Sequence, residues 1–103
     1  MKGHRPRDAE EEARAEQALY RAIQSLDTED ECRRFFRDLL TPAERQAMVD
    51  RWAVVPLLDR GLPYRRISEL TGVSVTTVGR VARFLTDGND GYRVALERTR
   101  DTD

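Results

Sequence analysis

Hydrophobic residues recur at helical spacing along most of the chain, and no segment shows the alternation expected of a half-buried strand. Residues 9–26 place an apolar stripe opposite a charged face, which predicts an amphipathic helix that needs a partner surface. The apolar members of this stripe are Ala15, Leu19, Ala22, Ile23 and Leu26. The pattern as a whole predicts an all-α protein.

A second helix is predicted over residues 28–40. Thr28 is a preferred N-cap residue, and Glu31 three positions later completes the pattern of a capping box. The apolar positions that follow at helical spacing are Cys32, Phe35, Phe36, Leu39 and Leu40. Because Cys32 is the single cysteine and lies on this stripe, it cannot form an internal disulfide, and we expect a buried thiol.

The third predicted helix runs from Pro42 to about Arg60. Thr41 can cap it, proline is favoured at the first helical position, and Glu44 places an acid in the first turn. Its apolar positions cover a broad arc: Ala47, Met48, Trp52, Val54, Val55, Leu57 and Leu58. Such breadth predicts a central helix that is buried on more than one side.

Two residues of this third helix disturb its C-terminal half. Pro56 removes one backbone hydrogen bond, so we expect a kink or a break near Arg51 and Trp52. Gly61 then has the position of a C-terminal cap, because glycine readily adopts the left-handed conformation that ends many helices.

Residues 63–85 have the spacing of a helix-turn-helix. The first helix should begin at Pro63, and Ser74 should cap the second. Gly72 supplies the positive φ that the intervening turn needs. The positions expected to face inward are Ile67, Leu70, Val73, Val78, Val81 or Ala82, and Leu85, with a small residue, Ser68, where the helices cross.

The second helix of this motif carries a polar stripe opposite its valines. Thr76, Gly79, Arg80 and Arg83 stand at i, i+3, i+4 and i+7, with short side chains first and arginines last. Such a face can enter a major groove, where threonine meets base edges and arginine binds guanine in bidentate fashion. A solvated face with incidental arginines is the alternative interpretation.

We therefore divide the candidate DNA contacts into two groups. The residues expected to read bases are Val75, Thr76, Gly79 and Arg80. The residues expected to hold the DNA backbone are Arg65, Arg66, Ser74, Thr77 and Arg83.

The distribution of charge supports this assignment, although the net charge of the chain is only −1. Residues 61–86 carry four arginines and one glutamate, whereas residues 1–31 carry five basic and nine acidic side chains. The motif thus lies in the most basic part of an otherwise acidic chain, which fits a local contact with phosphates.

Composition describes a small helical protein of 103 residues, 39% hydrophobic and 36% charged. We expect one helical DNA-binding domain over residues 9–100, between a flexible N-terminal arm at residues 1–8 and a frayed C-terminus at residues 101–103. No apolar run reaches the roughly 18 residues of a membrane span, and the N-terminus lacks a signal-peptide core. We expect a cytoplasmic protein without a membrane partner, associated with the nucleoid when bound to DNA.

From about Leu26 to Arg98 the chain resembles the Trp repressor superfamily, and within it the Trp-repressor-like YerC/YecD group. "FFRDLLTPAERQAMVDRW" resembles the start of the repressor core, "ISELTGVSVTTVGRVARFL" its DNA-reading region, and "GNDGY" at residues 88–92 a marker of that group. The resemblance implies an intertwined, all-helical homodimer of bacterial origin that reads successive major grooves of double-stranded DNA. A two-fold dimer then implies a palindromic operator.

The resemblance also implies a candidate effector pocket. Thr41, Arg51 and Arg80 stand where the tryptophan-controlled repressor holds its amino acid. Val81, however, replaces a glycine that leaves room beside that ligand, and the segment between Arg60 and Gly72 is one residue shorter than in that repressor. We expect no L-tryptophan control and no fixed cofactor, while a different small-molecule corepressor stays open.

Other chemistry has little support in the sequence. His4 is the only histidine and has no cysteine near it, so we expect no metal site and no catalytic residue. "GNDGY" lacks the lysine of a phosphate-binding loop and is better explained as a turn in which Asp90 caps the last helix. Trp52 and Tyr92 are expected to pack rather than stack on a ligand.

These observations predict a dimeric, sequence-specific DNA-binding transcriptional regulator, acting as a repressor, and not an enzyme. The alternative interpretation is a helical dimeric interaction module whose helix-turn-helix no longer reads DNA and docks another protein instead. The acidic ends of the chain keep that alternative open.

Overall fold

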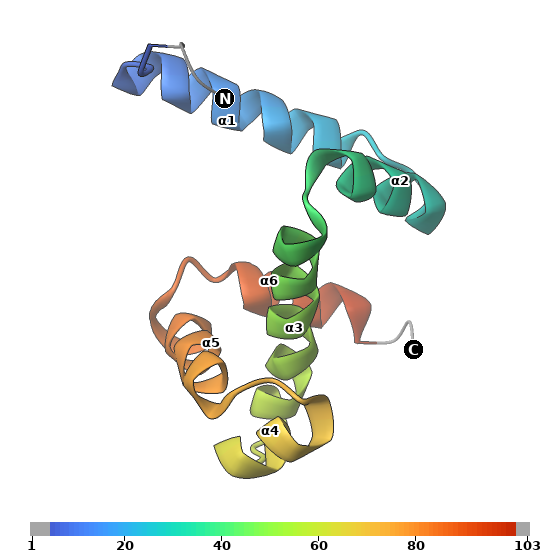
Figure 1. Ribbon diagram of the computed structural model, residues 1–103, viewed down its shortest axis with the longest axis vertical. Helices are drawn as coiled ribbons and strands as arrows, with labels where there is room; N and C mark the ends of the chain where they lie inside the picture. The colour runs from blue at the N-terminus through green and yellow to red at the C-terminus, as the bar shows by residue number, and fades with distance from the viewer. Residues whose placement is uncertain (1–4, 101–103) are drawn as a thin grey trace. The chain divides into compact units, whose positions relative to one another are not determined.

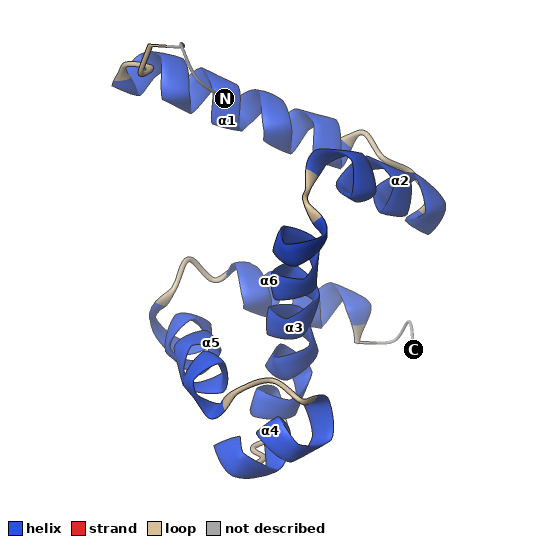
Figure 2. Ribbon diagram, in the orientation of Figure 1, coloured by secondary structure: helices blue, strands red, loops and turns tan. Residues whose placement is uncertain are grey.

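The computed structural model describes residues 5–100, and within that range it contains helices and no strand (Figures 1 and 2). The helices are α1 (Ala9–Gln24), α2 (Glu29–Leu39), α3 (Pro42–Asp59), α4 (Tyr64–Thr71), α5 (Val75–Asp87) and α6 (Gly91–Thr99). The predicted all-α class is confirmed. Residues 1–41 and residues 42–103 form two compact units, which are described separately.

In the first unit, α1 begins at a capping box that the sequence analysis did not identify. The Asp8 carboxylate accepts a hydrogen bond from the Glu11 N–H at 2.8 Å, and the Glu11 carboxylate accepts one from the Asp8 N–H at 3.0 Å. Arg5 and Arg7 form ion pairs with Glu11 and Glu12 at 2.7 and 3.0 Å. The hydrogen bond from Arg5, together with that from the Asp8 backbone, lowers the pKa of Glu11 to about 2.

These contacts concern the second half of the predicted N-terminal arm. Residues 1–4, with His4, and the predicted frayed residues 101–103 lie outside the described residues. The flexible arm and the single domain over residues 9–100 therefore stay predictions.

Helix α2 has only half of its predicted capping box. The Thr28 hydroxyl accepts a hydrogen bond from the Glu31 N–H at 3.0 Å, but the Glu31 carboxylate binds the Asp27 N–H at 2.8 Å instead of the Thr28 N–H. The rings of Phe35 and Phe36 pack edge to face with centroids 5.4 Å apart. No residue of α1 or α2 is fully buried, and Cys32, expected to be buried, is partly exposed.

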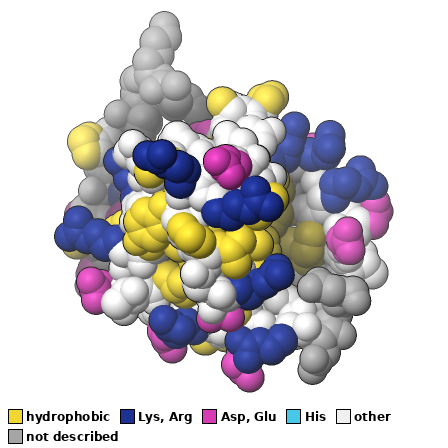
Figure 3. Space-filling view, turned by 90° about the horizontal axis from the view of Figure 1, so that it is seen from below, with side chains coloured by type: hydrophobic (Ala, Val, Ile, Leu, Met, Phe, Trp, Pro, Cys, Tyr) yellow, Lys and Arg dark blue, Asp and Glu magenta, His cyan; other side chains and the backbone are white. Residues whose placement is uncertain are grey.

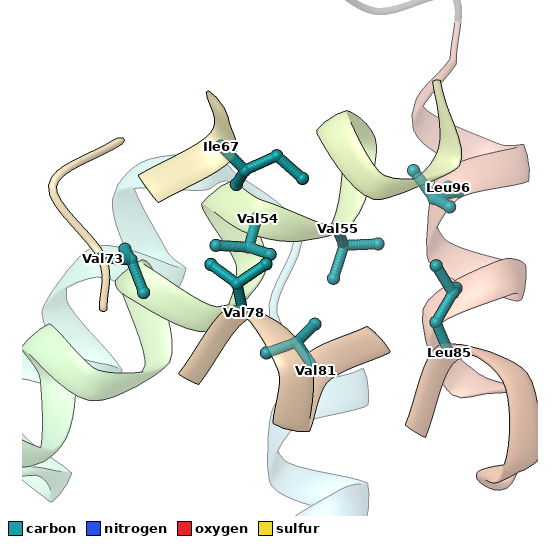
Figure 4. Packing of buried hydrophobic residues seen from close by; sticks show 8 residues of the cluster. All are labelled: Val54, Val55, Ile67, Val73, Val78, Val81, Leu85 and Leu96. Atoms are coloured by element: carbon teal, nitrogen blue, oxygen red, sulfur yellow. The ribbon is translucent and has the colours of Figure 1, made fainter. Parts of the chain in front are cut away.

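In the second unit, α3 packs against α4, α5 and α6, and α4 also packs against α5. Figure 4 shows the resulting core, in which Val54 of α3 and Val78 of α5 point toward each other. Its buried side chains are Val54, Val55, Ile67, Val73, Val78, Val81, Leu85 and Leu96. Each fully buried valine or isoleucine contributes about 1.5–3 kcal/mol relative to exposure, so this cluster fixes the arrangement of α3, α4 and α5.

The C-terminal half of α3 differs from its prediction in one respect. The helix continues unbroken through Pro56 to Asp59, so the expected break near Arg51 and Trp52 is absent, and the alternative of a kink there stays a prediction. The end of the helix is as predicted, because Gly61 has φ +82°. The Gly61 N–H donates to the Leu58 carbonyl and the Leu62 N–H to the Leu57 carbonyl, which is the hydrogen-bond pattern of a Schellman motif.

Several expectations for individual side chains of the second unit were wrong. Leu70 is 52% exposed, because α4 faces the core through Ile67 and the next inward position, one full turn later, is Thr71. Asp90 does stand at the N-cap of α6, but it has φ +69° and its side chain forms no capping hydrogen bond. The arc of α3 is likewise buried mainly at Val54 and Val55, while Met48 is 46% exposed.

Candidate nucleic-acid interface

The turn between α4 and α5 is held by both backbone and side-chain hydrogen bonds. Gly72 has φ +78°, and its N–H donates to the Ser68 carbonyl at 2.9 Å. The Thr71 hydroxyl donates to the Ile67 carbonyl at 2.7 Å and accepts from the Val73 N–H at 3.1 Å. Val73 is then buried as predicted. The two helices of the motif are therefore joined by a short turn that these hydrogen bonds hold in place.

Ser74 performs the capping role that the sequence predicts. Its hydroxyl accepts from the Thr77 N–H at 3.1 Å and lies 3.1 Å from the Thr77 hydroxyl, to which it donates. The cap satisfies one of the free N–H groups at the start of α5. The Ser74 hydroxyl thus already has two hydrogen-bond partners. To contact a phosphate it would have to redirect its donated hydrogen bond away from Thr77.

The face of α5 that lies opposite its buried valines is open to solvent along its length. Val75 is 48% exposed, and Thr76, Arg80 and Arg83 are exposed as well. Gly79 lies among them and is partly exposed. The buried valines of the same helix, Val78 and Val81, lie on the other side. The structure thus presents together the four residues predicted to read bases.

The arginines of this region differ in how available their charges are. Arg66 pairs with Glu69 at 3.4 Å, and both side chains are more than half exposed. Within the described part of the chain, Arg65, Arg80 and Arg83 form no ion pair. Because exposed pairs contribute little, Arg66 can exchange Glu69 for a phosphate at small cost.

A view from the α4 end of the second unit shows how charge and apolar surface combine there. Figure 3 shows hydrophobic side chains in the middle of this face, with arginine side chains and some Asp and Glu side chains around them. The exposed hydrophobic residues of the motif are Tyr64, Leu70, Val75 and Phe84. A mixture of arginines and apolar contact surface suits DNA, where phosphates meet the charges and thymine methyls meet the apolar groups.

One residue of this face was missed by the sequence analysis. Tyr64 is the first residue of α4 and is 45% exposed. A Cβ added at Gly79 would lie 3.7 Å from the Cε2 atom of Tyr64, so the ring lies beside α5 at its glycine. The only sequence signal was its place in "PYRR", directly before two arginines that were already candidates.

The candidate effector residues lie partly together. A partly open pocket in the second unit is lined by Arg51, Arg80, Val81, Phe84 and Tyr92. The Trp52 ring lies near Tyr92, with centroids 6.4 Å apart. Thr41 belongs to the first compact unit, so its predicted part in this pocket stays untested.

Residues 5–100 show neither a membrane-spanning helix nor a metal-binding cluster. No helix there is long and apolar enough to cross a membrane. No group of three or more His, Cys, Asp or Glu side chains in this range is placed to hold a metal ion.

Comparison with known proteins gives consistent matches over most of the chain. The family model described as Trp repressor protein matches residues 15–100. The uncharacterised protein YerC of Bacillus subtilis (strain 168) is 42% identical over 85 residues, which are 82% of each chain.

Two solved structures are similar over nearly the same range. A candidate Trp repressor from Staphylococcus aureus is 37% identical, with a TM-score of 0.79, and the match covers 84% of this chain and 86% of that one. A TrpR-like protein from Eubacterium eligens ATCC 27750 is 39% identical, with a TM-score of 0.80 and coverage of 85% and 91%.

Proposed function

The chain belongs to the Trp repressor family, and from that premise we propose that it is a sequence-specific, DNA-binding transcriptional repressor that acts as a homodimer. The observation that carries the proposal is the exposed polar face of α5, which lies opposite the buried valines of the same helix. The hydrogen-bonded turn before α5 fixes the start of that helix. In a helix-turn-helix protein the second helix lies in the major groove with its N-terminal residues at the base edges.

The roles of the individual side chains follow from their chemistry. Val75 and Thr76 are at the start of α5, where they meet base edges and thymine methyls. Arg80, one turn further along and without an ion-pair partner in the described chain, binds guanine O6 and N7. Arg65, Arg66 and Arg83 hold phosphates, and the Ser74–Thr77 cap holds the start of the helix in place.

Exposed apolar side chains support the homodimer. Val49 and Met48 of α3 are 56% and 46% exposed, and Val94 of α6 is 42% exposed. Helices α1 and α2 contain no fully buried residue, although both carry an apolar stripe. A second copy of the chain would cover such surface, and two-fold symmetry would then require a palindromic operator with half-site centres about 34–36 Å apart.

An interaction module that docks another protein through α5 is the competing function. Its support is the acidic N-terminal segment and the modest net charge of −1. Salt separates the two functions, because binding through several phosphates releases counterions and falls steeply with log salt concentration. We expect the duplex affinity to drop about tenfold or more between roughly 0.05 and 0.2 M salt. A duplex affinity that is absent or independent of salt would favour the protein-docking alternative.

Control by a small molecule is a separate matter from DNA reading. The pocket beside Arg51 and Arg80 has two cationic groups and aromatic walls, a combination that suits an anionic effector. Val81 is 2% exposed and forms part of its lining, where it reduces the room for an indole ring. We therefore expect L-tryptophan to leave the DNA affinity unchanged in a titration at fixed salt.

A further inference from the structure

Tyr64 lies on the face proposed to meet DNA, but it comes from α4 rather than from α5. Its Cε2 atom is 3.7 Å from the position that a Cβ of residue 79 would take, which is an ordinary van der Waals distance. The ring therefore lies beside α5 at contact distance from position 79, where a methyl group would still fit. A branched side chain at position 79 would carry additional atoms next to the ring, and we expect it to displace the ring.

The phenol hydroxyl is the unused chemical group of this residue. Within residues 5–100 it forms no hydrogen bond, although Tyr20, the other exposed tyrosine, donates to Glu16 at 2.5 Å. A ring that packs along one edge and carries a free donor is preorganised, because few rotatable bonds must be fixed when a ligand binds. The neighbouring residues Arg65 and Arg66 are exposed cations, so an anionic group would be attracted to this corner.

We propose that Tyr64 is a further DNA contact, in which its hydroxyl donates a hydrogen bond to a backbone phosphate at the edge of the half-site. The proposal rests on the proposed function. In this arrangement Gly79 has two roles, since it lets α5 approach the bases and leaves space for the Tyr64 ring. Tyr64 thereby ties α4 to the same stretch of duplex that α5 reads.

The test compares Tyr64→Phe, which removes only the hydroxyl, with Tyr20→Phe, which removes an exposed hydroxyl from the first unit. Binding of each full-length protein is measured on a duplex enriched from genomic DNA and on a random duplex of the same length. A charge-assisted hydrogen bond that is lost at a phosphate should weaken Tyr64→Phe about three- to tenfold on both duplexes. Tyr20→Phe should bind both as the unsubstituted protein does.

Three other outcomes of this experiment would each overturn a different claim. Unchanged affinity of Tyr64→Phe, beside normal binding by the unsubstituted protein, would overturn the role of Tyr64 and leave the proposed function intact. A loss confined to the enriched duplex would overturn the phosphate assignment, because it would indicate a base contact. Failure of the unsubstituted protein to bind any duplex, even at low salt, would overturn the proposed function and the Tyr64 contact together.

A second variant tests the packing that positions the ring. Gly79→Val should displace Tyr64, so adding Tyr64→Phe to it should cause little further loss of random-duplex affinity. Full additivity of the two losses would show that the hydroxyl acts independently of Gly79, and would overturn the proposed positioning. Thermal unfolding of each variant checks that the comparison is made between folded proteins.

Discussion

At the level of single residues, replacing Arg80 or Arg65 by alanine should change DNA binding in different ways. Both are exposed and without an ion-pair partner in the described chain, but Arg80 lies on α5 and Arg65 at the start of α4. Arg80→Ala should lower the affinity for the specific duplex by about 1–3 kcal/mol and relax specificity. Arg65→Ala should weaken all duplexes alike and flatten the salt dependence. Equal losses on specific and random DNA for Arg80→Ala would refute base reading by this residue.

Gly79 offers a test in which stability and binding change in opposite directions. Glycine inside a helix is about 0.5–1 kcal/mol less stable than alanine, and an added Cβ meets only ordinary contact distances here. Gly79→Ala should therefore raise the free energy of unfolding. It should also lower the affinity for DNA by about 1 kcal/mol or more, because the methyl group holds α5 away from the base edges. Stronger or unchanged binding would show that the duplex does not approach this position.

At the element scale, the turn of the helix-turn-helix depends on one left-handed residue. Gly72 has φ +78° and open space around it, so alanine would meet backbone strain without a clash. We expect Gly72→Ala to cost about 1–2 kcal/mol in urea unfolding. Gly91→Ala is the matched control, because Gly91 has equally open space and no positive φ. Similar losses for both variants would mean that strain at Gly72 is not the cause.

The start of α1 should respond to pH through Glu11. The pKa of this carboxyl is lowered from 4.5 to about 2 by the hydrogen bond from Arg5 and by that from the Asp8 backbone. A lowered pKa in the folded state means that the contribution is fully present above the unfolded value and is lost as pH falls toward 2. The protection factors of amides in the first turn, which correct for the intrinsic pH dependence of exchange, should therefore fall below about pH 4.5, and much less so in Glu11→Gln. An identical pH response in both proteins would contradict this role of Glu11.

The helices could be predicted from the sequence because the residues that mark helix ends act locally. N-cap residues, Pro42 and the glycines at 61 and 72 mark helix ends through backbone chemistry that needs no tertiary context, and the structure places helix boundaries beside them. Leu70 shows the limit. Its outward position depends on how the short helix α4 rotates against α3 and α5, and periodicity over eight residues does not fix that rotation.

The candidate site also contains residues that the sequence predicts and residues that depend on tertiary packing. The stripe on α5 was predictable because residues at i, i+3, i+4 and i+7 share one face of any helix. The position of the Tyr64 ring beside Gly79 was not, because it depends on how two helices pack across a turn. The pairing of Arg51 with Arg80 at one pocket followed only from the family resemblance.

For the whole molecule, the proposed function depends on a homodimer. Val49 on α3 is 56% exposed and apolar, so a charge introduced there should disrupt a surface that the proposed dimer would cover. Val49→Glu should shift the protein toward monomers in sedimentation equilibrium and lower its unfolding temperature, because the stabilisation that the dimer supplies is lost. Leu70→Glu, at another exposed apolar position, should leave the dimer intact. A monomeric unsubstituted protein would contradict the dimer directly.

Sequence-specific base reading by α5 is best tested by selecting sheared genomic DNA with the purified protein at about 0.15 M salt and sequencing the retained fragments. If the face of α5 reads bases in a two-fold dimer, the retained fragments should share one palindrome whose half-site centres are about 34–36 Å apart. Arg80→Ala should lose that enrichment while it still retains some DNA. Retention of no fragment, or of all fragments equally, would contradict sequence-specific reading by this protein.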